Sequence, residues 1–234
     1  MQGAINAKPR FVSLQDLQPW QTLIGSGVAF LAIAVTYLNT SRTLAKTQKL
    51  EEYRRTRKQE ALRAILPLAL SEVCQYAEIV CQRLLPLVNS CANRLLIHDG
   101  ITAPTFPLLP PDAIKSLSDF IEYADEIDVQ LPVALVRKLQ ILHARLTGLV
   151  SKMEDAGDVT QESWLESMVI DCAVLYARAA AAFEFSRGEK RDLPAAIDWG
   201  NVRLALKNMG QWDDEIPAVY KTIDQYEASG ATIK

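Results

Sequence analysis

Hydrophobic and polar positions separate sharply at the amino-terminal end of the chain. No charged residue occurs from residue 17 to residue 41, and the centre of this stretch, Leu23 to Leu38, is nearly all apolar or small. A helix rises about 1.5 Å per residue, so roughly 20 such residues cross a hydrocarbon layer about 30 Å thick. The pattern predicts a short tail over residues 1–19 and a transmembrane helix over residues 20–41.

The charges that follow the apolar stretch indicate its orientation. Between Arg42 and Arg63, eight basic residues stand against three acidic ones, a net charge of +5. Such an excess of cations marks the cytoplasmic end of a membrane helix and is attracted to anionic headgroups. A cleaved signal peptide carries its positive charge before the apolar run, and a soluble core helix needs no such flank. We expect a single-pass signal-anchor with the N-terminus outside and the C-terminal domain cytoplasmic. The predicted membrane-surface cations, called the basic collar below, are Arg42, Lys46, Lys49, Arg54, Arg55, Arg57 and Lys58.

Small residues recur along one side of the predicted membrane helix. The residues of this small-residue seam are Gly25, Ala29, Ala32 and Thr36, with Asn39 at its cytoplasmic end. Their spacing of three or four residues places them on one helix face, where small side chains let two membrane helices approach closely. The seam predicts self-association through the membrane helix. The alternative is chance alignment, because glycine and alanine are common in membrane helices.

Helical patterns continue beyond the membrane. Residues 42–60 favour a helix with few large apolar groups, which is typical of a solvated stalk. From Ala61, apolar residues return at helical spacing and predict one or two long amphipathic helices. Pro67 and Pro86 lack the amide donor, so we expect each to kink or break this helix.

The rest of the chain is predicted to be helical as well. A proline-rich extended connection over residues 98–112 precedes helical patterns at 112–128, 132–154, 161–187, 201–209 and 213–228. Strand-like alternation of apolar and polar residues is nearly absent. The predicted fold class is therefore all-α, with a transmembrane helix, a basic helical stalk, a cytosolic helical-bundle domain over residues 61–228 and a tail over 229–234.

Two ionisable residues, Asp171 and Arg178, interrupt the apolar pattern of residues 167–185. Each would cost about 2.5 to 3.5 kcal/mol in a membrane, so this segment is expected to be the central helix of the bundle. The two residues are seven positions apart, hence on one face but about 10 Å apart along the axis. Each needs a partner from another helix, either in a buried ion pair or in a ligand site.

Motifs for catalysis or metal binding are not found in the sequence. Cys74 and Cys81 are two helical turns apart, which is too far for one zinc ion, and the four cysteines are expected to be reduced thiols. Asp119, Glu122, Glu126 and Asp128 are expected to belong to a solvated acidic face. From Ala64 onward, 15 basic and 24 acidic residues give a net charge of −9, which argues against nucleic acid as a partner.

These features predict a membrane-anchored cytosolic helical interaction module, such as an adaptor, a scaffold or an accessory subunit. Its expected partners are the lipid bilayer and another protein or a second copy of the chain. The alternative is a membrane-tethered regulator that senses a small ligand between bundle helices near Asp171 and Arg178. An enzyme and a cofactor are not expected.

Overall fold

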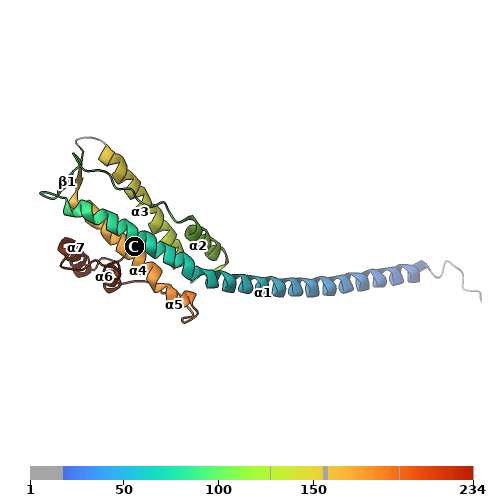
Figure 1. The fold of residues 1–234 in the computed structure, drawn as a ribbon. Helices are drawn as coiled ribbons and strands as arrows, with labels where there is room; N and C mark the ends of the chain where they lie inside the picture. Colours follow the sequence, from blue (N-terminus) through green and yellow to red (C-terminus); the bar gives the residue numbers. More distant parts are fainter. Residues whose placement is uncertain (1–17, 127, 155–157, 195, 234) are drawn as a thin grey trace, which may run out of the picture. The chain divides into compact units, whose positions relative to one another are not determined.

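The prediction of an all-α fold is confirmed by the computed structural model, which is 73% helix and 3% strand. The structure describes residues 18–126, 128–154, 158–194 and 196–233, and describes side chains from residue 26 onward except those of residues 29 and 34. The chain divides into two compact units, Met1–Arg55 and Thr56–Lys234. The first unit contains the start of helix α1, and the second contains a helical bundle (Figure 1).

Helix α1 runs without interruption from Gln18 to Asn89 and includes both Pro67 and Pro86. The expectation that these prolines could break the helix is wrong. A proline removes one backbone hydrogen bond, whereas packing of an apolar face provides most of a helix's stability in a protein. Both prolines lie close to a buried apolar side chain of the same helix. Leu66 directly precedes Pro67, Leu84 lies two residues before Pro86, and both leucines are almost completely buried.

Eight shorter elements and the end of α1 form the bundle unit. They are β1 (Leu95–Ile97), α2 (Pro111–Tyr123), α3 (Gln130–Glu154), β2 (Val159–Gln161), α4 (Glu162–Ala181), α5 (Phe183–Ser186), α6 (Trp199–Asn208) and α7 (Pro217–Ala228). The strands pair antiparallel, with Leu96 opposite Thr160. The sequence did not predict them, because three residues are too few to show strand-like alternation.

Helix α2 begins as predicted but ends early. Pro111 occupies its first turn, where a missing amide donor costs nothing, and Asp112 complements the helix dipole. The helix was expected to reach residue 128 but ends at Tyr123. Asp128 is instead buried and accepts a hydrogen bond from the backbone N–H of Leu193 at 3.3 Å. This contact fixes the chain before α3, so Asp128 does not belong to a solvated acidic face.

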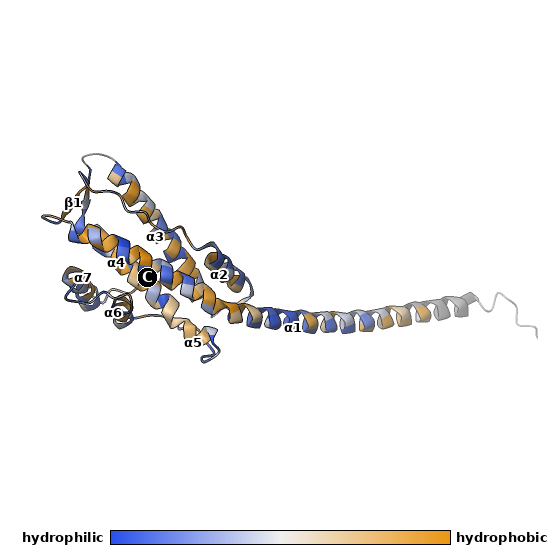
Figure 2. Ribbon diagram, in the orientation of Figure 1, coloured by the Kyte–Doolittle hydropathy of each residue, from blue (hydrophilic) through white to orange (hydrophobic). Residues whose placement is uncertain are grey.

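Helix α4 is the central helix of the bundle, in agreement with the expectation from the sequence. Its buried residues occupy most positions between Leu165 and Ala179, so they lie on nearly all of its sides. It packs against α3, α6 and α7, and hydrophobic stretches run along both α3 and α4 (Figure 2). One stripe of α1 completes the core. The buried residues of that stripe include Leu62, Leu66, Leu70, Val73, Ala77, Val80, Leu84 and Leu87.

Arg63 attaches α1 to the segment that follows α4. Its Nε donates a hydrogen bond to the carbonyl oxygen of Phe185 at 2.6 Å, and a terminal nitrogen donates to the carbonyl oxygen of Lys190. The guanidinium carbon lies 4.0 Å from the centre of the Phe185 ring, which in turn meets Phe120 edge to face at 5.9 Å. Arg63 therefore acts within the bundle.

Replacing Arg63 with alanine should destabilise the bundle by about 1–3 kcal/mol, because two carbonyl groups lose a charged donor and a ring loses its cation. The measurement is chemical denaturation of the full chain in detergent, followed by circular dichroism. Lys49→Ala, at an exposed position of α1, is the matched control and should leave the midpoint unchanged. Equal midpoints for both variants would contradict this role of Arg63.

Candidate functional site

The first candidate site is the apolar surface near the start of α1. Seven large side chains between residues 28 and 38 are each more than half exposed, namely Val28, Phe30, Leu31, Ile33, Val35, Tyr37 and Leu38. Since successive helix positions differ by about 100°, these side chains point in all directions around the axis. A helix that is apolar on all sides needs an apolar environment on all sides, either protein or lipid.

The length and composition of α1 meet the criterion for a membrane-crossing helix. Among the described residues, one helical stretch, Ser26–Asn89, is long and apolar enough to cross a membrane, and an 18-residue window within it has a mean hydropathy of 1.4. The core helix of a soluble protein can meet the same criterion, and 44% of the apolar window is buried. The buried residues of α1 begin at Leu62, so this window lies in the part of α1 that packs in the bundle and does not include Val28 to Leu38, which are exposed. One helix thus combines a bundle-packed half with an exposed apolar segment.

The small-residue seam is described in part. The side chains at Gly25 and Ala29 lie outside the described residues, whereas Ala32, Thr36 and Asn39 are exposed. The Thr36 hydroxyl donates to the carbonyl oxygen of Ala32 at 2.8 Å, so this polar group is satisfied within its own helix. Such bonding to the preceding turn lets threonine face an apolar medium at little cost. Self-association through the seam stays a prediction.

The basic collar forms a second exposed surface on α1. All seven of its side chains are exposed. The last of them, Lys58, also contacts the bundle, because its ammonium nitrogen lies 5.8 Å from the centre of the Tyr123 ring at the end of α2. The collar therefore follows the apolar segment directly along the same helix, and its final cation contacts the helical domain.

Asp171 lies between two cations of helix α3. Its carboxylate is 2.6 Å from the ammonium nitrogen of Lys138 and also pairs with the guanidinium of Arg145. Arg145 donates further to the hydroxyl of Ser167 at 2.5 Å and lies 5.4 Å from the Trp164 ring centre. The side chain of Asp171 is 14% exposed, so these contacts offset the cost of its burial. The arrangement joins α3 to α4 and leaves no open carboxylate for a ligand.

Arg178 contacts a different part of the chain. It is 9% exposed, and its guanidinium donates to the carbonyl oxygen of Ile233 at 3.3 Å. Burial lowers the pKa of Arg178, because the charged form loses solvation. Nearby, the indole N–H of Trp199 donates to the carbonyl oxygen of Ala231 at 2.9 Å. The structure therefore does not bring Asp171 and Arg178 together, and the segment after α7 covers Arg178.

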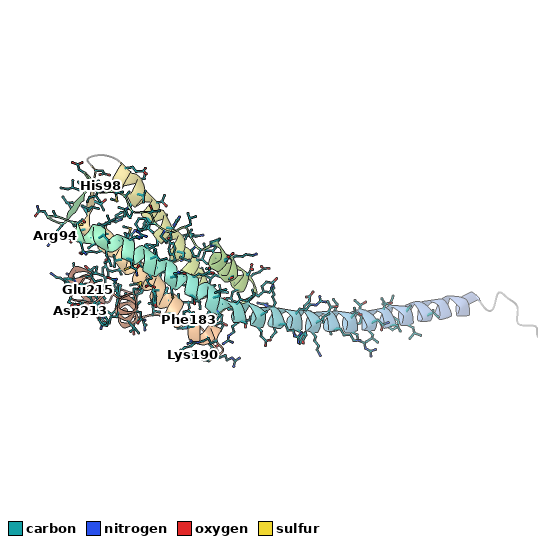
Figure 3. The ribbon with its side chains drawn as sticks, viewed as in Figure 1. Arg94, His98, Phe183, Lys190, Asp213 and Glu215 are labelled. Carbon is teal, nitrogen blue, oxygen red and sulfur yellow. The ribbon has the colours of Figure 1, made fainter. Side chains whose placement is uncertain are left out.

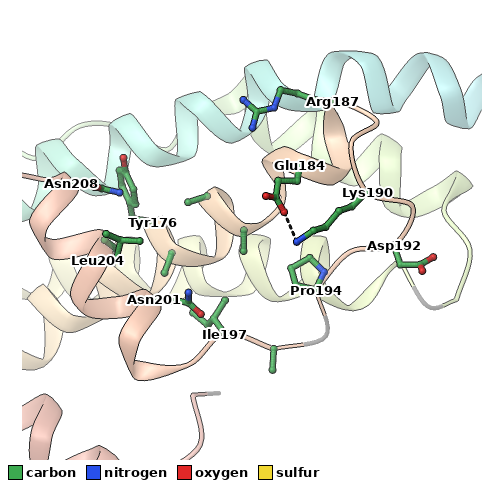
Figure 4. Close-up of a pocket in the computed structure, with 15 residues that line it drawn as sticks. Tyr176, Glu184, Arg187, Lys190, Asp192, Pro194, Ile197, Asn201, Leu204 and Asn208 are labelled. Atoms are coloured by element: carbon green, nitrogen blue, oxygen red, sulfur yellow. Dashed lines mark ion pairs between the residues drawn. The ribbon is translucent and has the colours of Figure 1, made fainter.

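A cavity of about 550 Å³ opens between α4, α6 and the segment after α5 (Figure 4). Ala177, Ala180 and Ala181 contribute small side chains of α4, while Leu204, 56% exposed, contributes an apolar side chain of α6. An ion pair between Glu184 and Lys190, 2.5 Å long, stands among its lining residues. Neither Asp171 nor Arg178 lines this cavity. Sequence reasoning did not find it, because its walls come from separate segments.

The cysteine thiols are free, and their surroundings make them unreactive. Cys81 and Cys172 are completely buried, while Cys74 and Cys91 are partly buried. Burial raises the pKa of both Cys74 and Cys81 to about 12, with a smaller contribution from the charge of Glu78. A thiol that stays protonated at neutral pH is a poor nucleophile and a poor metal ligand. Within the described residues, no group of three or more histidine, cysteine or acidic side chains could hold a metal ion.

Both histidines are engaged in contacts between elements. His98 Nδ1 lies 3.0 Å from the carbonyl oxygen of Lys152, so this nitrogen donates. In the neutral ring, Nε2 then accepts from the Thr160 hydroxyl at 2.9 Å. His143 Nδ1 lies 3.2 Å from the phenolic oxygen of Tyr76. His98 thereby ties the strand pair to the end of α3, a role that its position in the sequence did not indicate.

Comparison of the chain with protein-family models, with curated proteins and with solved structures gives no match.

Asp171→Asn should destabilise the bundle by about 1–3 kcal/mol, because Lys138 and Arg145 would lose the carboxylate that they share. The matched control is Asp224→Asn. Asp224 also pairs with an arginine, Arg203, but its side chain is 67% exposed, so its loss should change the stability by about 0.5 kcal/mol or less. Chemical denaturation of both variants measures the difference. Similar losses for the two variants would show that the Asp171 contacts add nothing beyond a surface pair.

Proposed function

We propose that this chain is a single-pass membrane-anchored interaction module. In this proposal residues 20–41 cross the bilayer, the amino terminus lies outside, and the helical bundle lies in the cytoplasm. The observation that carries the proposal is the succession along α1 of seven exposed apolar side chains and seven exposed cations. The first group favours lipid and the second favours an anionic membrane surface.

The free energies support insertion of the apolar segment. On insertion scales each leucine, isoleucine, valine or phenylalanine contributes about −0.3 to −0.6 kcal/mol, so the six of them between Val28 and Leu38 contribute about −2 to −4 kcal/mol together. No charged residue between residues 17 and 41 opposes this gain. The helical backbone satisfies its own polar groups, and the hydroxyls of Thr36, Ser41 and Thr43 donate to carbonyl oxygens of the preceding turn.

The cations of the basic collar support the proposed orientation. Each lysine or arginine near an anionic cytoplasmic leaflet contributes about 1 kcal/mol of attraction. Seven such residues outside the apolar segment would strongly resist transfer across the membrane. The bundle follows the collar, so it would stay on the same side as these cations.

Exposed apolar side chains on the bundle support an interaction role. Ile65 and Leu68 of α1 are 51% and 65% exposed, and Trp212, which precedes α7, is 50% exposed. Tryptophan is enriched among the few residues that contribute most of the binding energy at protein interfaces. The proposed partner is another protein or a second copy of the chain, with the membrane seam as the contact between copies.

The second candidate function is a membrane-tethered regulator that holds a small ligand between bundle helices. The cavity between α4 and α6 favours it, because Arg63 of α1 hydrogen-bonds the backbone at Phe185 and Lys190 beside that cavity. A ligand there would contact the same segment that α1 holds. In this candidate function, ligand binding would affect α1 through the Arg63 contacts. An adaptor needs no such effect of a ligand on α1.

Membrane insertion can be tested with paired charges. The double change Leu31→Lys and Ile33→Lys should release the chain from carbonate-washed membranes, since two lysines cost about 5–7 kcal/mol and exceed the apolar gain. Leu44→Lys with Leu50→Lys, in the predicted stalk, is the matched control and should remain in the membrane. Retention of the first variant would exclude residues 20–41 as the anchor.

Orientation calls for a separate measurement. A reporter that is active only in the cytosol, fused after Lys234, should be active, because the basic collar holds the bundle on that side. A reporter that is active only outside should be silent at the same position. The opposite pattern would exclude the proposed topology.

If copies of the chain associate through the small-residue seam, replacing its small side chains with larger ones should weaken self-association. Gly25→Ile with Ala29→Ile should reduce energy transfer between labelled copies in membranes several-fold, because the two helices could no longer approach closely. Gly27→Ile with Ala34→Ile makes the same two changes on the opposite face of the helix, about 180° from the seam, and serves as the control. Unchanged transfer in the seam variant would place any contact between copies elsewhere.

A further inference from the structure

A second cavity, of about 610 Å³, lies where the strand pair meets α4 and α7. Charged and amide side chains from three separate parts of the chain line it, including Asn93, Arg94, Glu162, Glu166, Lys221 and Gln225. Arg94 stands at the end of the bundle where α1 ends (Figure 3). The volume falls within the range of about 300–1,000 Å³ that is usual for small-molecule sites.

The turn that carries Arg94 has an unusual backbone. Asn93 and Arg94 both have positive φ angles, 51° and 65°. Mutual hydrogen bonds between Ala92 and Leu95, of 2.9 and 3.0 Å, close the turn around them. Glycine is the residue expected at the second of these positions, because an L side chain is disfavoured there. The carbonyl oxygen of Arg94 accepts from the N–H of Glu162 at 3.0 Å, so the turn is fixed against the start of α4.

Glu166 provides a desolvated carboxylate beside this turn. It is 9% exposed, and its Oε2 accepts a hydrogen bond from the Thr222 hydroxyl at 3.4 Å. Burial raises the pKa of Glu166, and the charge of Glu162 one turn earlier adds to the shift, whereas Thr222 and Arg94 oppose it. A carboxylate that has lost water and faces a like charge gains from a bound cation.

The charges around the cavity are balanced. Glu162 and Glu166 supply two carboxylates, while Arg94 and Lys221 supply two cations. Amides of Asn93 and Gln225 can both donate and accept hydrogen bonds. A ligand that matches this lining carries an ammonium group and a carboxylate group on one small skeleton.

We propose that this cavity binds a small zwitterion of the α-amino acid or dipeptide class. The ammonium group of the ligand pairs with Glu162 and Glu166, and its carboxylate pairs with Arg94 and Lys221. All four residues belong to the bundle unit, so the site does not depend on the proposed membrane anchoring. Ligand binding also has a readout distinct from membrane insertion, so each proposal can fail separately.

The experiment measures thermal unfolding of the full chain in detergent with each of the twenty amino acids and with dialanine, at about 10 mM. This concentration stabilises a site whose dissociation constant is about 1 mM or lower. At least one of these zwitterions should raise the unfolding midpoint. Its N-acetyl and methyl ester derivatives, which lack the ammonium or the carboxylate, should bind about tenfold more weakly in calorimetry. If none of the probes raises the midpoint, or if both derivatives bind as well as the parent, the proposal is wrong.

Two variants locate the ligand. Arg94→Gly removes the guanidinium at a backbone position that suits glycine, so the fold should stay as stable as before or become more stable. Glu166→Gln removes the charge and keeps the shape. Each should weaken binding about tenfold or more, while Asn208→Ala, which changes the other cavity, should leave affinity unchanged. Unchanged affinity in both Arg94→Gly and Glu166→Gln would overturn the assignment.

Discussion

The bundle depends on the burial of α4. A helix that is apolar on nearly all sides cannot stand at the surface of a soluble domain, so other helices have to cover it. Helices α3, α6 and α7 pack against it, and Cys74 of α1 approaches the carbonyl oxygen of Tyr176 at 4.0 Å. Small side chains allow the close approach, because Ala173, Ala177 and Ala179 are all buried along this helix. The other helices of the bundle are therefore positioned around α4, where they cover its apolar sides.

The burial of most of α4 also determines what its polar side chains can do. Asp171 is paired with two cations from α3, and Arg178 is covered by the backbone near Ile233. Both are used to fix neighbouring elements, since a buried charge without such contacts would cost several kcal/mol. Glu166 differs, because it lines a cavity and faces another carboxylate. The difference between structural and binding roles therefore lies in whether the charge is already compensated.

Helix α1 meets two physical requirements with one continuous helix. Its later part presents one buried stripe to the bundle, and Arg63 fixes that part to the segment after α4. Its earlier part exposes apolar side chains on all sides between Val28 and Leu38. Packing supports the first part, and the proposed bilayer would support the second. Helix α1 thus connects the bundle to its proposed anchor along the chain.

The sequence by itself determined the helical character of the chain, the uncharged apolar stretch at residues 17–41 and the position of the basic collar. These features depend on residues that are close together along the chain, so local periodicity and charge reveal them. It also placed α4 at the centre, because Asp171 and Arg178 disfavour a membrane while their neighbours disfavour water.

The tertiary structure alone decided how distant side chains combine. Only the structure shows that α1 continues through Pro67 and Pro86 and that β1 pairs with β2. It also shows that Lys138 and Arg145 are the partners of Asp171. It also brought Arg94, Glu166 and Lys221 to one cavity. The acidic pair Glu162 and Glu166 was visible in the sequence one turn apart, yet nothing local indicated what faces it. Such contacts depend on which helix faces pack together, and periodicity reports only that a face is apolar.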